Sequence, residues 1–320
     1  VNVWGTVDLE VFSFNSIGEV RGNGSDSRLV GSDRTTYVDV FTDLVEREGS
    51  TPAATFSVEP STFSNAVQFV DSPLSTVETV FNISELDNSS PTETGEFSRT
   101  EEIRFAGFQQ VSGGGGDDIF DIRLGEEAVF DGQLLGGAGS DLFLFRDSEG
   151  SLEGRLFSIG AIDGGDSSGS GEMDIIDFSN LGSNVVVDFG AGTAQWGDGG
   201  SLNSVSGIEQ ILGNATATAT APNVLRGTPG ADQFEITQDN GGILNGVQFF
   251  GFGQLDGAGG SDWFGFSNQA NVQEVIGGSG FDILKLDDSG LSLNSQYAIS
   301  GNSISGNRMY SFSEIDALEL

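Results

Sequence analysis

A repeated glycine-rich turn is the feature that most limits what this chain can fold into. The segment Arg104–Ile122 (RFAGFQQVSGGGGDDIFDI) aligns without a gap with Gln248–Phe266 (QFFGFGQLDGAGGSDWFGF), and nine of the nineteen positions are identical. A second unit follows each copy, LLGGAGSDLFLF at Leu134–Phe145 and VIGGSGFDILKL at Val275–Leu286. Self-similarity of this kind is the signature of an architecture in which neighbouring repeats stack on one another.

The repeated unit is a glycine cluster, an aspartate and then alternating apolar residues, as in Leu142–Phe145 (LFLF). Short alternating runs bounded by glycine predict β-strands, and no stretch sustains a helical apolar period beyond about two turns. The 49 glycines provide residues for sharp corners, and the 25 phenylalanines provide most of a core.

We therefore expect an all-β fold, a right-handed parallel β-solenoid of the β-helix or β-roll kind, with irregular loops. Coils of about 20–25 residues would set strands of successive coils side by side in parallel. The right hand follows from the strong preference of parallel crossover connections. Along the chain we expect an N-terminal β-rich segment at 1–100, a first Gly/Asp repeat block at 101–220 and a second block at 221–320.

Charge and missing residue types exclude many functions. The chain holds 48 acidic against 12 basic residues, a formal charge of −36, and has neither cysteine nor histidine. Disulfides, thiol nucleophiles, zinc fingers and histidine-based catalysis are therefore excluded. So acidic a surface repels nucleic acid and anionic lipid, and no apolar run is long enough to span a bilayer. We expect neither a nucleic-acid partner nor membrane insertion.

Carboxylate doublets and aromatic residues are the features of this sequence that bear on the cleavage or binding of carbohydrates. Neighbours on a strand point to opposite faces, so doublets such as Asp117-Asp118 and Asp287-Asp288 are not spaced as the acid and base of a glycosidase. We expect no enzymatic activity. Six aromatic residues are candidates for a platform that binds surface glycans, with packing as the competing interpretation. They are Trp4, Tyr37, Trp196, Trp263, Tyr297 and Tyr310.

The turns resemble the nonapeptide G-G-x-G-x-D-x-U-x of RTX-type calcium-binding proteins, in which U is a large apolar residue. Gly136–Leu144 (GGAGSDLFL) and Gly277–Lys285 (GGSGFDILK) match it in full. The segments 178–213 and 287–320 are similar to the degenerate repeats of giant bacterial surface proteins, the RTX-like and filamentous-haemagglutinin-like adhesins. This resemblance implies calcium as a cofactor. Its ligands would be the motif aspartates Asp118, Asp141, Asp232, Asp262 and Asp282.

The spacing departs from the RTX pattern. Together with Asp174, the motif aspartates are separated by 23, 33, 58, 30 and 20 residues, and no two are nine apart as in a tandem array. Calcium requires 6–8 oxygen ligands, which such spacing does not gather by itself. The alternative is that each aspartate accepts backbone N–H bonds and fixes its own turn.

The resemblance implies a structural or adhesive segment of a secreted or cell-surface bacterial protein, located outside the cell. Residues 1–12 and 315–320 both have strand-like patterns, so we expect partners at both ends. These would be copies of the chain stacked into a filament or further repeats of one longer chain. The alternative function is a calcium-binding RTX-type module of a secreted enzyme.

Overall fold

The described part of the protein is all-β. Its structure, a computed structural model, describes residues 19–21, 29–30, 36–44, 54–55, 77–87, 98–99, 103–106, 108–114, 117–123, 129–146, 158–165, 171–197, 199–214, 217–218, 220–267, 270–286, 298–300, 303–305 and 309–319. None of these residues is helical, which confirms the predicted fold class at that level. The strand expected over residues 1–12 lies outside the described residues.

The chain divides into two compact units, Val1–Ile176 with Val205–Ile208, and Asp177–Ser204 with Glu209–Leu320. We call them the first and second units. The strands of the first unit are β1 (Glu19–Arg21), β2 (Leu29–Val30), β3 (Thr36–Leu44), β4 (Ala54–Thr55), β5 (Val77–Asp87), β6 (Ser98–Arg99), β7 (Ile103–Ala106), β8 (Phe108–Gly114), β9 (Ile119–Arg123), β10 (Val129–Gly137), β11 (Leu142–Arg146), β12 (Ser158–Gly165) and β17 (Val205–Ser206). Strand β13 (Ile175–Asn180) begins in the first unit and ends in the second.

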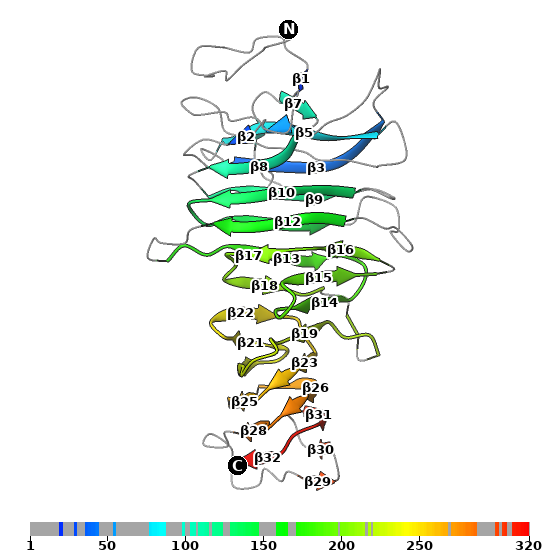
Figure 1. Ribbon diagram of the computed structural model, residues 1–320, viewed down its shortest axis with the longest axis vertical. Coiled ribbons are helices and arrows are strands. Elements are labelled where there is room, and N and C mark those ends of the chain that lie inside the picture. The colour runs from blue at the N-terminus through cyan, green and yellow to red at the C-terminus, as the bar shows by residue number, and fades with distance from the viewer. Residues whose placement is uncertain are drawn as a thin grey trace. The chain divides into compact units, whose positions relative to one another are not determined.

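From β7 to β12, successive strands of the first unit alternate between two sheets (Figure 1). One sheet has the order β1-β7-β5-β3-β9-β11, and the other has the order β2-β8-β10-β12. From β8 onward the pairs are parallel, and equivalent residues of β9 and β11 lie 23 positions apart, as in Phe120 opposite Phe143. Strands β3, β5 and β7 pair antiparallel instead.

The core of the first unit consists of side chains stacked from one coil to the next. Phe120 and Phe143 are fully buried, with ring centroids 4.6 Å apart and nearly parallel planes. On the other sheet, Val111, Leu134 and Ile162 are in register and equally buried. Apolar residues two positions apart point to the same side of a strand, so the alternation in the sequence builds this interior.

The second unit has more and shorter strands. They are β14 (Val185–Asp188), β15 (Thr193–Trp196), β16 (Gly200–Leu202), β18 (Gln210–Leu212), β19 (Val224–Arg226), β20 (Gln233–Gln238), β21 (Gly241–Leu244), β22 (Val247–Phe250), β23 (Gln254–Asp256), β24 (Gly259–Gly260), β25 (Trp263–Phe266), β26 (Val272–Ile276), β27 (Ser279–Gly280), β28 (Ile283–Leu286), β29 (Ala298–Ser300), β30 (Ser303–Ser305), β31 (Met309–Ser313) and β32 (Ala317–Glu319).

The two main sheets of the second unit have equal numbers of strands. One has the order β18-β22-β21-β20-β25-β28-β32 and the other β16-β15-β14-β19-β23-β26-β31. Each contains one antiparallel meander, β20–β21–β22 or β14–β15–β16, among parallel neighbours. Because each meander adds two extra strands to its own sheet, the sheets keep equal numbers of strands and both can face a common core.

These meanders are the main difference from the expected all-parallel pairing. The turns of β20–β22 are two-residue hairpins, Asp239–Asn240 and Asn245–Gly246, in which Asn240, Asn245 and Gly246 have positive φ as tight hairpins require. The parallel registers are also less even than expected. In the second unit they range from 20 residues, for Leu255 opposite Val275, to 38 residues, for Val187 opposite Leu225.

The core of the second unit repeats that of the first. Phe234 and Phe264 are fully buried and stacked, with centroids 4.6 Å apart, and Leu284 continues their row. Leu225 and Leu255 are in register in the other sheet and also have no exposed surface. The glycine-rich turns connect these two layers, and they carry the residues that the sequence singled out.

Candidate functional site

The motif aspartates form two ladders at the starts of strands of one sheet in each unit. The first aspartate ladder consists of Asp118, Asp141 and Asp174, which lie just before β9, β11 and β13. The second aspartate ladder consists of Asp232, Asp262, Asp282 and Asp316, which lie just before β20, β25, β28 and β32. Within each ladder, residues far apart in the sequence are thus brought to successive turns.

Each ladder is held by one repeated hydrogen bond. The backbone N–H of one aspartate donates to a carboxylate oxygen of the aspartate in the next turn. Asp118 N donates to Asp141 Oδ1 at 2.8 Å, and Asp141 N donates to Asp174 Oδ1 at 2.8 Å. In the second ladder the distances are 2.8 Å from Asp232 N to Asp262 Oδ1, 2.9 Å from Asp262 N to Asp282 Oδ1 and 2.9 Å from Asp282 N to Asp316 Oδ2. The carboxylates therefore do accept backbone N–H bonds, but chiefly from a neighbouring turn.

The ladder carboxylates are buried, and several have one unpaired oxygen. The six that the sequence analysis named are between 0% and 3% exposed. Oδ2 of Asp141, Asp262 and Asp282 is buried without a hydrogen-bond partner. An unpaired buried oxygen destabilises a folded protein, and more so when it carries charge.

The first glycine of each turn is fixed by the same contacts. A Cβ on Gly257 would overlap both Asp262 Oδ2 and the carbonyl oxygen of Gly277 in the next turn. A Cβ on Gly136 would overlap Asp141 Oδ2 and the Gly164 carbonyl oxygen in the same way. The Gly-x₄-Asp spacing therefore encodes close packing of a glycine backbone between its own aspartate and the following turn.

Burial raises the pKa of two ladder aspartates. Desolvation is the main cause for Asp141, whose pKa rises to about 8, with a smaller increase from the charge of Asp174. Desolvation likewise raises the pKa of Asp262 to about 6, with contributions from Asp232 and Asp282. In both residues the hydrogen bond from the preceding aspartate's N–H acts in the opposite direction without reversing the shift.

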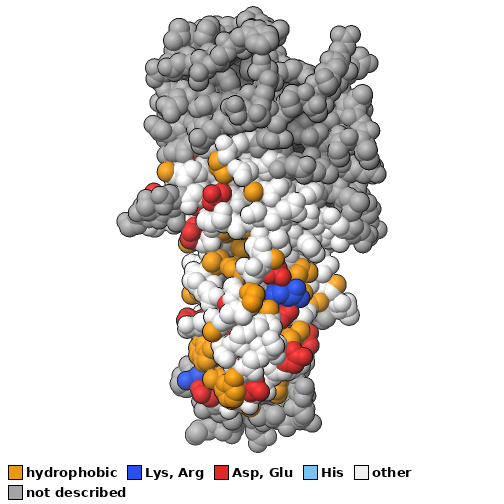
Figure 2. Space-filling model, in the orientation of Figure 1, with side chains coloured by type: hydrophobic (Ala, Val, Ile, Leu, Met, Phe, Trp, Pro, Cys, Tyr) orange, Lys and Arg blue, Asp and Glu red, His pale blue; other side chains and the backbone are white. Residues whose placement is uncertain are grey.

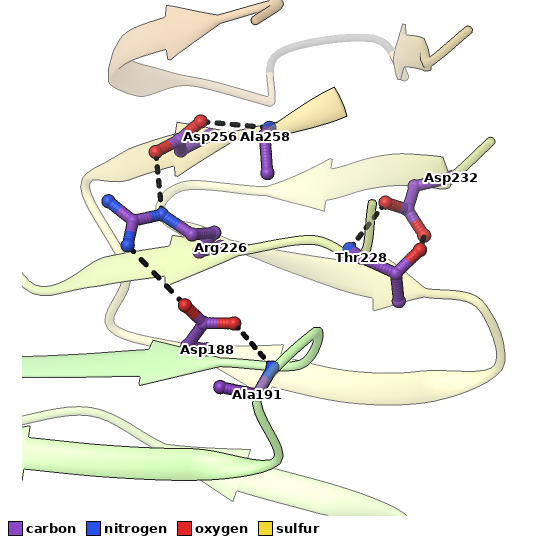
Figure 3. Close-up of polar contacts among 7 residues, drawn as sticks. All are labelled: Asp188, Ala191, Arg226, Thr228, Asp232, Asp256 and Ala258. Atoms are coloured by element: carbon purple, nitrogen blue, oxygen red, sulfur yellow. Dashed lines mark hydrogen bonds and ion pairs between the residues drawn. The ribbon is translucent and has the colours of Figure 1, made fainter. Parts of the chain in front are cut away.

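Asp232 is satisfied differently from Asp262. Figure 3 shows its carboxylate turned toward Thr228, whose N–H donates to Oδ2 at 2.6 Å and whose hydroxyl donates to Oδ1 at 2.9 Å. Asn245 of the adjacent meander adds a third donor, from Nδ2 to Oδ1 at 2.5 Å. This aspartate fixes its own turn as well as its neighbour, as the alternative interpretation of the sequence had it.

An asparagine has the equivalent position before β19 of the other sheet. Asn223 Oδ1 accepts the Val185 N–H at 2.9 Å, and its Nδ2 donates to the carbonyl oxygens of Asn214 and Gly251 at 3.0 and 2.7 Å. Both Asn223 and Asn214 are buried. Sequence analysis missed Asn223 because no Gly/Asp turn surrounds it. It missed Asp316 because Glu314, whose φ of 55° is rare outside glycine, stands in that turn in place of a glycine.

An ion-pair row lies on the outside of the second unit. Arg226 Nε is 2.9 Å from Asp256 Oδ2, and its Nη1 is 3.4 Å from Asp188 Oδ2 (Figure 3). The hydrogen bond to Asp256 raises the pKa of Arg226. On the face drawn in Figure 2, basic side chains are sparse and lie beside acidic ones. These contacts neutralise part of the acidic excess and tie three neighbouring strands together.

The other sequence candidates that the structure describes differ in their burial. Asp117 is exposed whereas Asp118 is buried, so the two side chains of this doublet point to opposite sides, as expected. Trp196 is buried beside Phe178, and Trp263 is half-buried on β25. Trp4, Tyr297 and the doublet at 287–288 lie outside the described residues.

The ladder carboxylates do not form an evident calcium site. Among the described residues, no group of three or more acidic side chains comes together to hold a metal ion. Asp141, Asp262 and Asp282 use Oδ1 for a backbone N–H, and their Oδ2 atoms are buried close to glycine backbone. We therefore do not assign the five predicted aspartates as calcium ligands. Calcium binding by this chain stays a prediction.

No protein-family model matches this chain, and no curated protein matches it. In the described part of the chain, no helix is long and apolar enough to cross a bilayer.

Proposed function

We propose that this chain is a structural or adhesive segment of a secreted or cell-surface bacterial protein, with no chemistry of its own. It forms or extends an elongated filament as a right-handed parallel β-solenoid interrupted by antiparallel meanders. The observation that carries this proposal is the use of the repeat residues. First glycines such as Gly136 and Gly257, and ladder aspartates such as Asp141 and Asp262, are occupied by contacts to neighbouring turns, so the repeat serves stacking.

The coil itself is supported by the alternation of successive strands between two sheets and by the parallel registers within each unit. The right hand follows from the general preference of parallel crossovers. Sheets built this way have open edges unless something covers them, so copies of the chain or further repeats are the partners we propose, end to end. Surface glycans remain candidate adhesive targets.

Assembly tests this proposal directly. Light scattering and electron microscopy of the purified chain should find elongated particles that associate end to end as concentration rises. A compact monomer of 33.4 kDa at all concentrations would contradict a filament-forming role.

Calcium separates the proposal from its alternative, a calcium-binding module of a secreted enzyme. At a formal charge of −36, divalent ions bound by the folded state should stabilise it by mass action. We expect millimolar calcium to raise the melting temperature more than sodium chloride of equal ionic strength does. We expect the same rise in the Asp262→Asn and Asp282→Asn variants. Loss of the rise in these variants would favour ladder-bound calcium and the alternative function.

A further inference from the structure

Asn223, which has the equivalent position in the other sheet, shows which hydrogen bond the second polar atom of such a side chain can make. Its Nδ2 donates to the Gly251 carbonyl oxygen at 2.7 Å, while Oδ1 accepts a backbone N–H. A Cβ on Gly213 would lie 2.6 Å from Nδ2 and 3.0 Å from the Gly251 oxygen. The N–H donor therefore lies between a glycine backbone and a carbonyl oxygen contributed by the next turn.

The Oδ2 atoms of Asp141 and Asp262 have the corresponding position. A Cβ on Gly136 would meet Asp141 Oδ2 and the Gly164 carbonyl oxygen, and a Cβ on Gly257 would meet Asp262 Oδ2 and the Gly277 carbonyl oxygen. In each case Oδ1 accepts a backbone N–H, as Oδ1 of Asn223 does. The difference is that a carboxylate oxygen facing a carbonyl places two acceptors together, with nothing to donate.

The charged groups around these two aspartates do not supply the missing hydrogen-bond donor. Those that face Asp141 are Asp118 and Asp174 of its ladder, and the neighbouring Asp117 and Glu172, all of them acidic. Those that face Asp262 are Asp232, Asp282 and Asp256, and Arg226 pairs with Asp256 rather than with the ladder. Ionised carboxylates would thus repel one another along each ladder in a dry environment.

We propose that the ladders bind protons as the protein folds in mild acid, with Asp141 and Asp262 held there as neutral carboxylic acids. The Oδ2–H of Asp141 donates to the Gly164 carbonyl oxygen, and that of Asp262 donates to the Gly277 carbonyl oxygen. The proton supplies the donor that the amide of Asn223 carries permanently. The proton comes from water, and no covalent bond other than the O–H bond changes.

The elevated pKa values of the two groups, about 8 for Asp141 and about 6 for Asp262, agree with this arrangement. Their sign fixes the pH dependence. A carboxyl with a raised folded-state pKa keeps its proton while the unfolded chain loses it, so stability falls as pH rises from 3.8 to the folded-state pKa. Each group raises the unfolding constant about tenfold per pH unit within that window. The protein should be more stable in mild acid than in mild base.

Two substitutions with the same chemistry test the proposal. Asp262→Asn should fold, because its amide can donate to the Gly277 oxygen without a proton. Relative to wild type, its unfolding constant should fall by about two orders of magnitude as the pH rises from 4 to above 6, because between 3.8 and about 6 Asp262 loses its proton only in the unfolded chain. Asp232→Asn is the matched control. Its Oδ2 accepts the Thr228 N–H. An amide nitrogen in place of that oxygen would set two N–H donors against each other, so the variant should be less stable than wild type at pH 8.

Denaturant unfolding of the full chain at a series of pH values measures both variants. Equal destabilisation by Asp262→Asn and Asp232→Asn at pH 5 would overturn the proposal, because it would mean that Asp262 is already charged below its raised pKa of about 6. Carbon-13 NMR of the aspartate carboxyls in the wild-type chain provides a second measurement that does not depend on the variants folding. The Asp141 and Asp262 resonances should titrate above the usual aspartate range near 3.9. Titration of both within that range would equally reject the bound protons.

Discussion

Two turns of the second unit have the same spacing and satisfy their aspartates in different ways. Gly227–Asp232 (GTPGAD) and Gly257–Asp262 (GAGGSD) each place a glycine five residues before a ladder aspartate. In the first, Thr228 donates its N–H and hydroxyl to the carboxylate, and Asn245 of the meander adds a donor. In the second, Oδ2 of Asp262 has no donor from the protein.

The difference teaches that the spacing fixes the position of the carboxylate while its neighbours decide its ionisation. Threonine at the second position supplies a hydroxyl, and the meander beside Asp232 supplies an amide. Ala258, at the same position of the other turn, has no polar side chain, and that turn stacks on a parallel neighbour through β24 and β27. A stacked turn is covered by backbone, so the aspartate inside it meets carbonyl oxygens rather than donors.

The largest effect should come from filling the space between glycine and aspartate. We expect Gly257→Ala to destabilise the protein by about 3 kcal/mol, as expected when a closed core is overpacked, because its Cβ would overlap Asp262 Oδ2 and a carbonyl oxygen. Gly230→Ala is the matched control in the other turn. Its Cβ would have only an ordinary contact, 3.5 Å from Thr228 Oγ1, so its effect should stay within about 0.5 kcal/mol. Denaturant unfolding measures both, and equal costs would refute the steric account.

A smaller effect should follow from making the two turns alike. Thr228→Ala removes the hydroxyl that donates to Asp232 Oδ1 at 2.9 Å and accepts the Gly230 N–H at 3.1 Å. We expect a loss of about 1.5 kcal/mol in the free energy of unfolding, the range of a hydrogen bond to a charged group. Thr228→Ser keeps the hydroxyl and should recover most of the stability. If serine fails to do so, the methyl group and not the hydroxyl is what matters.

The comparison also shows how far the sequence reaches. The glycine, the aspartate and the alternating residues after it locate β11, β25 and β28 almost to the residue, because these signals are local. Which turns stack on which depends on registers of 20 to 38 residues, and those follow from the meanders rather than from the repeats. The hairpin dipeptide Asn245-Gly246 is the local sign of one meander.

The ladder bonds themselves have no local signal. The N–H that Asp262 Oδ1 accepts belongs to Asp232, 30 residues earlier, and no pattern around either residue specifies that pairing. The protonation of Asp262 follows from burial and from the absence of a donor at Oδ2, which are properties of the assembled turn. Sequence alone therefore identified the residues and left their partners, and hence their chemistry, undecided.

The smallest effect concerns the ion pair that links the two turns. Arg226 directly precedes Gly227, Asp256 directly precedes Gly257, and their side chains meet at 2.9 Å. Since the arginine is 43% exposed, solvent screens the pair, and Arg226→Gln should cost below about 1 kcal/mol. The cost should shrink further in molar salt, where charges more than about 3 Å apart are screened. Lys285→Gln removes an exposed ion pair, in which Lys285 Nζ lies 3.7 Å from Glu319 Oε2, and it should cost less still. Equal unfolding midpoints for the two variants at low salt would show that the link between the turns contributes no more than an isolated surface pair.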